Sequence, residues 1–182
     1  KNDAEIQPEP IAQTPKLVVG IVVDQMRYDY LTRFWNQYGE GGFKRLVNEG
    51  FNCKNNHFNY APTSTGPGHA SVYTGTTPSM HGIIGNDWFD KESGQDVYCA
   101  GDDSYTSVGT ISDAGQMSPH RMLTTTITDQ LRLHTQKRGK VIGVALKDRG
   151  AVLPVGHTAN AAYWFEGGAT GNWITSSYYM ET

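Results

Sequence analysis

Residues 16–24 read Lys-Leu-Val-Val-Gly-Ile-Val-Val-Asp, an apolar run that ends in a carboxylate. An apolar run without alternation predicts a strand that is buried on both faces, as in a parallel sheet covered by helices. Asp24 would then lie at the carboxyl end of the strand, where open α/β sheets bind their ligands. A second run of this kind spans residues 140–146 and is followed by Lys147, Asp148 and Arg149. These two runs are the strongest candidates for central strands.

Helix and turn patterns fill the chain between and after the two runs. We predict helices over 27–38, 41–50, 67–74 (ended by Gly75) and from Ser118-Pro119 to Gly139. Hairpins are predicted near 85–100 and 161–179, because strand-like segments there flank short glycine-containing turns. The order of elements predicts the α/β class with a largely parallel sheet. Since only two strands have the pattern of a sheet centre, we expect that sheet to be incomplete.

Composition narrows the classes of function. The 182 residues carry a net charge of −3 and no basic stripe, so nucleic acid is not an expected partner. No apolar run approaches the length of a transmembrane segment. Residues 1–15 are polar and proline-rich, and we interpret them as a flexible leader before a single domain over 16–182. Cys53 and Cys99 are expected to be unpaired thiols, with a disulfide between them as the alternative.

A cluster of hydroxyl side chains is the most informative candidate site. Thr63, Ser64 and Thr65 immediately precede Gly66-Pro67-Gly68, where a helix is expected to begin. Free backbone N–H groups and the positive end of a helix dipole suit an anion held beside an oxygen nucleophile. No carboxylate or histidine close in sequence is an obvious base, so a bound metal is the simpler way to activate a hydroxyl. Helix capping without chemistry is the alternative interpretation.

Further polar residues could stabilise such an anion. Lys147 and Arg149 are two apart at a predicted strand end, so their side chains would point to the same side and could bind a tetrahedral oxyanion. Asn86 follows a glycine bend and could donate its amide to the same oxyanion. Asp24 is a candidate metal ligand. Each assignment has an alternative. Lys147 and Arg149 could be solvated surface charges, Asn86 could be a turn residue, and Asp24 could be a helix cap or turn residue. Six histidines form no close-spaced metal pair, although His69 and His81 flank the hydroxyl cluster.

In combination, three groups of residues resemble the alkaline phosphatase superfamily. They are Val22 to Leu31, then Thr65-Gly66-Pro67-Gly68-His69, then Thr74-Gly75 with Pro78 to Ile83 and Gly85 to Trp88. Within that superfamily the chain is most similar to periplasmic, zinc-dependent phosphatases of Bacteroidetes that use a threonine nucleophile. The resemblance covers the chain from about Lys16 onward. It implies an alkaline-phosphatase-like α/β/α sandwich.

The resemblance also implies roles for the candidate residues. Thr65 would be the nucleophile that forms a phosphothreonine, and Asp24 and Thr65 would bind zinc, of which two ions are expected. Asn86, Lys147 and Arg149 would contact phosphate oxygens. The Lys-x-Arg pair is typical of the branch that hydrolyses small phosphate monoesters, whereas related phosphodiesterases and nucleotide pyrophosphatases are not expected to carry it. A diesterase, or a non-catalytic phosphate-binding fragment, is the alternative function.

The family is considerably longer than this chain, and its other zinc ligands lie downstream of the residues here. We therefore interpret the chain as an N-terminal portion that is inactive by itself and whose site the remainder of the polypeptide completes. Periplasmic or otherwise exported localisation is expected from the same resemblance.

Overall fold

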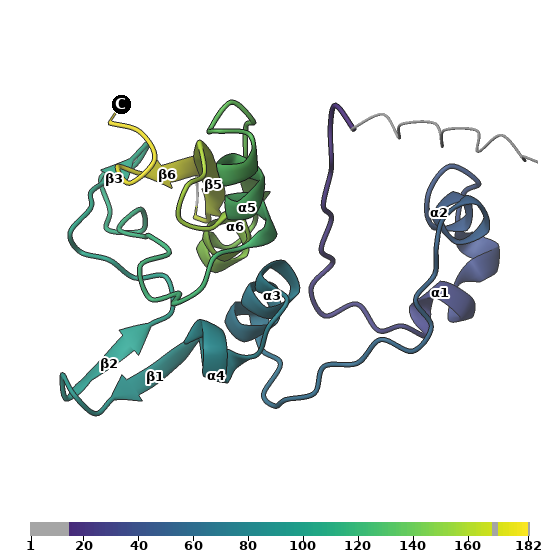
Figure 1. The fold of residues 1–182 in the computed structure, drawn as a ribbon, viewed down its shortest axis with the longest axis horizontal. Helices are drawn as coiled ribbons and strands as arrows, with labels where there is room; N and C mark the ends of the chain where they lie inside the picture. The colour runs from purple at the N-terminus through teal and green to yellow at the C-terminus, as the bar shows by residue number, and fades with distance from the viewer. Residues whose placement is uncertain (1–14, 169–170, 182) are drawn as a thin grey trace, which may run out of the picture. The chain divides into compact units, whose positions relative to one another are not determined.

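The computed structural model describes residues 15–168 and 171–181; the predicted leader lies outside them except for Pro15. The chain divides into two compact units, Lys1–Gln37 and Tyr38–Thr182, and each is described by itself. Figure 1 shows the elements of both units along the chain.

The described part of the first unit contains two short helical segments. They are α1 (Tyr30–Arg33) and a 3-10 helix, η1 (Trp35–Gln37), where one continuous helix over 27–38 was predicted. Residues 16–23 form no strand, and Leu17 and Ile21 are both 79% exposed. The predicted burial of this run on both faces is therefore wrong. The physical reason is that a strand needs a paired neighbour, and no strand among the described residues pairs with this segment.

The second unit contains the remaining helices and all the strands that the structure describes. In chain order these are α2 (Phe43–Glu49), α3 (Thr65–Thr74), α4 (Pro78–His81), β1 (Asp87–Asp90), β2 (Gln95–Tyr98), β3 (Ser107–Val108), α5 (Ile127–His134), β4 (Ile142–Ala145), α6 (Asp148–Val155), β5 (Ala161–Glu166) and β6 (Asn172–Ser176). The predicted helix before Gly75 is confirmed, with its start two residues earlier, and Gly75 ends it in the left-handed conformation (φ 69°).

Two sheets organise these strands. The hairpin β1–β2 is an antiparallel pair in which Asp87 lies opposite Tyr98. The other sheet has the order β3-β6-β5-β4; β4 and β5 are parallel, and the remaining pairs are antiparallel. Both predicted hairpins are present and the α/β class is confirmed, although the described sheet is mixed.

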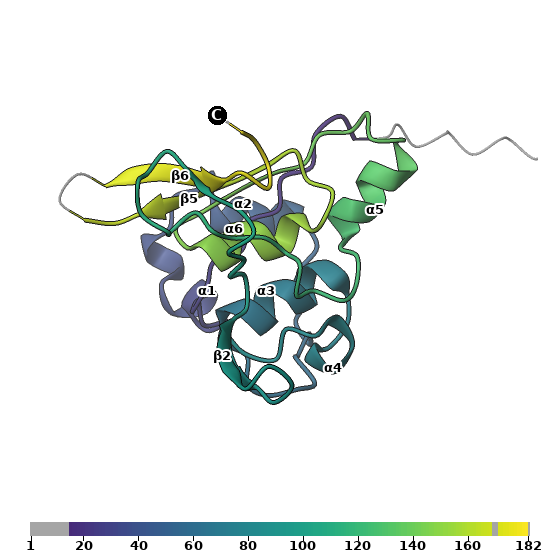
Figure 2. The ribbon, with the colours of Figure 1, turned by 90° about the vertical axis from the view of Figure 1, so that its left-hand side faces the viewer.

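Helix α6 connects the parallel strands β4 and β5 and packs on both of them. In Figure 2, β5 and β6 run side by side above α6. Gly143 of β4 lies so close to α6 that an added Cβ would be 2.5 Å from Val155 Cγ1. The other face of β4 carries Ile142 and Val144, which are exposed. The prediction that 140–146 is buried on both faces is therefore wrong, because helices cover one face only among the described residues.

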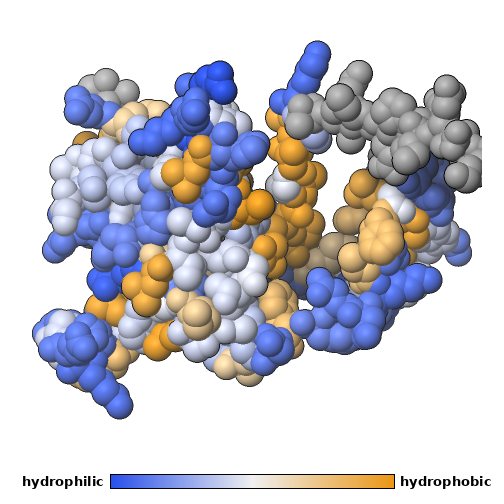
Figure 3. Space-filling model, viewed as in Figure 1, coloured by the Kyte–Doolittle hydropathy of each residue, from blue (hydrophilic) through white to orange (hydrophobic). Residues whose placement is uncertain are grey.

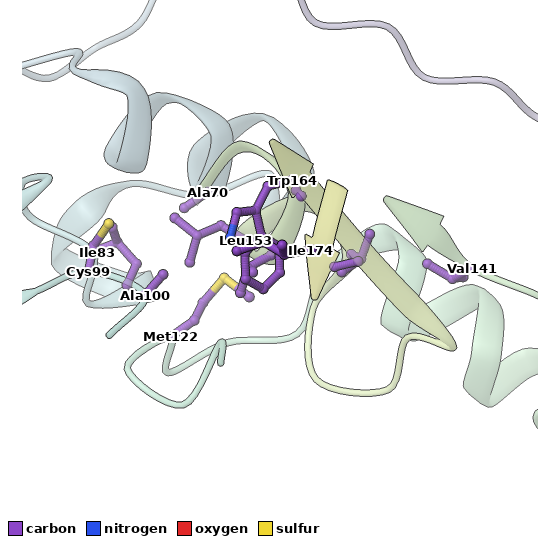
Figure 4. Packing of buried hydrophobic residues seen from close by; sticks show 13 residues of the cluster. Ala70, Ile83, Cys99, Ala100, Met122, Val141, Leu153, Trp164 and Ile174 are labelled. Atoms are coloured by element: carbon purple, nitrogen blue, oxygen red, sulfur yellow. The ribbon is translucent and has the colours of Figure 1, made fainter. Parts of the chain in front are cut away.

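The hydrophobic core lies around α6, which packs on α3 and on strands β4 and β5. Leu153 of α6 and Ile174 of β6 are buried in it, together with Trp164 of β5, whose indole N–H donates to the Ala114 carbonyl at 3.0 Å. Figure 4 shows these side chains packed with Ala70, Ile83, Cys99 and Met122. Full burial of a side chain such as Leu153 contributes about 1.5–3 kcal/mol. This core fixes the positions of the starts of α3 and α6.

Helix α5 begins at a different place from the one predicted. Its N-cap is Thr126, which forms a reciprocal capping box with Asp129, and it ends at His134, well before Gly139. Ser118 caps no helix, because residues 119–121 form only a bend and a turn. Its Oγ accepts the His120 N–H at 3.2 Å and donates to the carboxylate of Asp102. A serine-proline pair favours a helix start locally, and the local contact to His120 forms, but no helix continues from it here.

The surface of the first unit retains the apolar character of its sequence. Figure 3 shows the 17–23 run as a continuous hydrophobic column. None of the helices that the structure describes is long and apolar enough to cross a membrane.

Candidate functional site

Helix α3 places Thr65 at its first position. Ser64 is the N-cap residue in an extended conformation, and its carbonyl accepts the Gly68 N–H at 2.9 Å. The Ser64 side chain makes no capping hydrogen bond, so the capping interpretation does not hold for this hydroxyl. Thr65 is half-buried. Because Thr65 is the first residue of the ten-residue helix α3, it lies at the positive end of the helix dipole, where negative charge is favoured.

Asn86 lies beside this helix start. The Gly66 N–H donates to Asn86 Oδ1 at 2.8 Å, which identifies that atom as the amide oxygen. The Asn86 amide N–H₂ group is a donor that suits an oxyanion. Glycine suits position 66, because an added Cβ would lie tightly at 3.1 Å from Cys99 Sγ and 3.2 Å from Asn86 Oδ1. The structure thus brings the predicted residues Thr65 and Asn86 together.

Arg149 reaches the same region from the first turn of α6. Its side chain is 16% exposed, and its Nη1 donates to the Tyr98 hydroxyl at 2.8 Å. Arg149 Nη1 is also 3.9 Å from the Asp148 carboxylate. Arg149 Nε is buried and has no hydrogen-bond partner in the part of the chain that the structure describes. A buried N–H donor on a guanidinium costs free energy unless it is paired, so this group is suited to an anion.

Tyr98 connects the hairpin to α6. Its hydroxyl donates to Asp148 Oδ1 and accepts from Arg149. Burial raises the pKa of Tyr98 well above its usual range, so the hydroxyl stays protonated. The next residue, Cys99, donates its N–H to the Asn86 carbonyl at 2.8 Å. The hairpin therefore touches both helix starts.

Lys147 is positioned differently from Arg149. It is the N-cap residue of α6 and is exposed. The two residues lie on a helix start and not on a strand end, so the alternation expected for a strand does not apply. The convergence of their side chains stays a prediction, because both residues lie at the start of the same helix but strand alternation no longer supports it.

Both flanking histidines hydrogen-bond to groups of α3. The His69 ring bonds the Thr65 carbonyl through Nδ1 at 2.8 Å. His81 is fully buried; its Nδ1 accepts the Ile83 N–H, so its Nε2 donates to the Ser71 hydroxyl at 2.9 Å. Burial lowers the pKa of His81, which favours the neutral ring.

A serine, a histidine and an aspartate also meet at an open cleft beside β2. The Ser118 hydroxyl donates to Asp102, and His120 Nδ1 is 3.2 Å from the same carboxylate. Ser118 is fully buried, so no substrate can reach its oxygen. This arrangement is not a nucleophilic triad.

The metal-site prediction rests on Asp24 and Thr65. Asp24 lies in a turn after the apolar run, in the first unit. Carboxylate and hydroxyl oxygens suit zinc, which needs three or four protein ligands. Within residues 15–168 and 171–181, no group of three or more His, Cys, Asp or Glu side chains could hold a metal ion. These residues alone do not form a zinc site.

Both cysteines are unpaired, as expected. Cys53 is exposed and Cys99 is buried. Burial raises the pKa of the Cys99 thiol to about 12, which makes it unreactive.

Tyr98 and Asp148 are the site residues that the sequence analysis missed. Asp148 stands between the two predicted cations, and Tyr98 ends a predicted hairpin strand. Their adjacency depends on the packing of the hairpin against α6, which spacing along the chain does not reveal.

Known proteins match this chain over nearly its whole length. Residues 18–182 match the family model "Type I phosphodiesterase / nucleotide pyrophosphatase". The alkaline phosphatase PhoV of Synechococcus elongatus is 55% identical over 100% of this chain and 33% of its own length. The alkaline phosphatase PafA of Elizabethkingia meningoseptica is 55% identical over 92% of this chain and 31% of its own length.

Solved structures of PafA match as well. The wild-type crystal structure has a TM-score of 0.91 and 53% identity over 94% of this chain and 33% of that one. A PafA variant in which a threonine is replaced by serine, and an asparagine, a lysine and an arginine by alanine, also has a TM-score of 0.91, with 51% identity over the same shares. The chain spans about a third of the length of these relatives. It belongs to the type I phosphodiesterase / nucleotide pyrophosphatase family of the alkaline phosphatase superfamily.

Proposed function

We propose that this chain is the N-terminal part of a phosphate monoesterase of the alkaline phosphatase type, with Thr65 as its nucleophile. The observation that carries the proposal is the arrangement around Thr65. Thr65 lies at the start of α3, the Asn86 amide is oriented by Gly66, and the hairpin that follows Asn86 contacts Arg149 through Tyr98. A nucleophile beside several preorganised donors is what phosphoryl transfer requires.

The proposed reaction has two displacements. The Thr65 oxygen loses its proton and attacks phosphorus, and the bond from phosphorus to the alcohol oxygen breaks as the alcohol leaves with a proton. Water then attacks the phosphothreonine and releases phosphate and the free hydroxyl. Asn86, Arg149 and Lys147 donate hydrogen bonds to the nonbridging oxygens, where negative charge develops.

Zinc belongs to the proposal only for the longer polypeptide. Asp24 and Thr65 would be among its ligands, and the others would come from residues outside this chain. A bound pair of zinc ions would lower the pKa of the attacking hydroxyl and of water. Export to the periplasm is proposed on the resemblance alone.

The relatives support monoester hydrolysis over the diesterase alternative. PhoV and PafA are both named alkaline phosphatases. The four residue types replaced in the PafA variant are the types proposed here, in the same order. The spacing from threonine to asparagine and from lysine to arginine is also the same. This agreement supports Thr65, Asn86, Lys147 and Arg149 as a functional set.

Two substrates test the proposal in the full-length polypeptide. We expect hydrolysis of an aryl phosphate to be faster than hydrolysis of a diaryl phosphate, and Thr65→Ala to reduce the first rate at least about a thousandfold. Ser64→Ala is the matched control, since it removes the neighbouring hydroxyl, and its rate should stay near that of the wild type. A preference for the diester would favour the alternative, and full turnover by Thr65→Ala would exclude this nucleophile.

A further inference from the structure

We propose that Tyr98 is a positioning residue for Arg149. The β1–β2 hairpin would thereby fix the positions of both groups that donate to the anion, the Asn86 amide and the Arg149 guanidinium. The inference rests on the proposed function and adds a residue to it. Tyr98 acts through Arg149 and is not itself assigned to the substrate.

Two contacts join Tyr98 to the guanidinium. Arg149 Nη1 donates to the Tyr98 hydroxyl oxygen at 2.8 Å. The guanidinium carbon also lies 5.8 Å from the centroid of the Tyr98 ring, within the range of a cation–π contact. The hydrogen bond to the Tyr98 hydroxyl fixes the direction of Arg149 Nη1. The contact with the Tyr98 ring fixes the position of the guanidinium plane. Because the guanidinium is rigid and planar, its other donors are then fixed too.

Asp148 orients the tyrosine in turn. The Tyr98 hydroxyl donates its proton to Asp148 Oδ1, which leaves the hydroxyl lone pairs for Arg149. The direct approach of Asp148 to Arg149 Nη1 is 3.9 Å, too long for a hydrogen bond. Tyr98 is therefore the hydrogen-bonded link between the carboxylate and the guanidinium. Its raised pKa supports a neutral hydroxyl that can serve as donor and acceptor together.

The guanidinium has donors left for a ligand. Arg149 Nε is buried and has no hydrogen-bond partner among the described residues. With Nη1 held by Tyr98, an anion that binds Nε would meet a group already fixed in direction. Preorganisation of this kind stabilises a bound oxyanion because no side-chain freedom is lost on binding.

The hairpin extends this control to Asn86. Tyr98 pairs with Asp87, the residue after Asn86, and the Cys99 N–H donates to the Asn86 carbonyl at 2.8 Å. The open end of the hairpin thus holds Asn86 and Tyr98 side by side. Asn86 then contacts the start of α3, and Tyr98 the start of α6.

A double-mutant cycle in the full-length polypeptide tests the inference. Tyr98→Phe retains the ring and removes the hydroxyl, so we expect kcat/KM for an aryl phosphate to fall about tenfold, as for a lost hydrogen bond to a charged group. The affinity for inorganic phosphate, measured by calorimetry, should weaken as well. In an Arg149→Ala background the same change should alter both quantities less than about twofold, because positioned donors no longer exist there. Tyr163→Phe is the matched control. Tyr163 is half-buried, its hydroxyl donates to Met180 Sδ at 3.9 Å, and the variant should behave as wild type.

The outcomes separate positioning from a structural role and from failure of the proposed function. Wild-type kcat/KM and phosphate affinity in Tyr98→Phe, or an equal loss in the Arg149→Ala background, would overturn the inference. If Tyr98→Phe does not fold, Asp148→Asn replaces it in the same cycle, and an additive loss would again overturn the inference. An inactive Thr65→Ala together with a neutral Tyr98→Phe would remove only this inference. Full turnover by Thr65→Ala would instead remove the proposed function, and phosphate affinity would still decide the role of Tyr98.

Discussion

Leu17 and Leu153 are the same residue type in two regions that differ sharply. Leu153 lies in α6 and is fully buried, whereas Leu17 lies in the apolar run of the first unit and is 79% exposed. Both residues lie in apolar stretches of the sequence, residues 17–23 and residues 151–155. The difference teaches that an apolar pattern becomes a core only where other elements pack against it. In the described residues, that packing is present around α3 and α6, which carry the candidate site.

The largest effect on stability is expected from the core itself. Leu153→Ala should reduce the free energy of unfolding of the 182-residue chain by about 2–5 kcal/mol, because it removes buried methyl groups and leaves a cavity. Urea unfolding followed by circular dichroism measures this change. Leu17→Ala is the matched control and should change stability by less than about 0.5 kcal/mol. Equal losses in the two variants would remove the contrast between the regions.

A smaller effect is expected at the buried carboxylate of Asp129. It accepts hydrogen bonds from Thr126, and from Thr158 N and Oγ1 at 2.8 Å each. Asp129→Asn should destabilise the chain by about 1–3 kcal/mol, since an amide N–H₂ would face these donors. Urea unfolding at neutral pH measures the loss, and unchanged stability would show that the network contributes nothing.

The same carboxylate predicts a direction for the pH dependence. Burial alone raises the pKa of Asp129, but the hydrogen bonds from Thr126, His157 and Thr158 outweigh it and hold that pKa below the usual value of an aspartate. A lowered folded-state pKa contributes stability above the unfolded pKa, and this stability is lost as the pH falls through the folded value. The wild type should therefore lose stability below about pH 4, and Asp129→Asn should show a flatter profile there. Parallel acid profiles of the two proteins would contradict this assignment.

Much of the local structure could be predicted from the sequence. Residues 65–75 contain a helix and its glycine stop, and the hairpin of β1 and β2 lies where alternation and a glycine turn predicted it. These elements depend on short-range preferences, which sequence patterns report well.

Other features depend on tertiary contacts and could not be predicted. Ser118 bonds Asp102 instead of starting a helix, and the start of α5 is held by Asp129, which also binds residues 157 and 158. The candidate site also contains a residue that only tertiary contacts reveal. Thr65, Asn86 and Arg149 were predicted by residue type, whereas Tyr98 is identified only by its contacts with Asp148 and Arg149.

The most direct test of the central claim is to identify the residue that becomes phosphorylated. The full-length polypeptide is mixed with an aryl phosphate and quenched in acid, and its peptides are examined by mass spectrometry. We predict one phosphoryl group on Thr65, present in Ser64→Ala and absent in Thr65→Ala. A phosphoryl group on Ser64, or steady turnover by Thr65→Ala, would contradict the account.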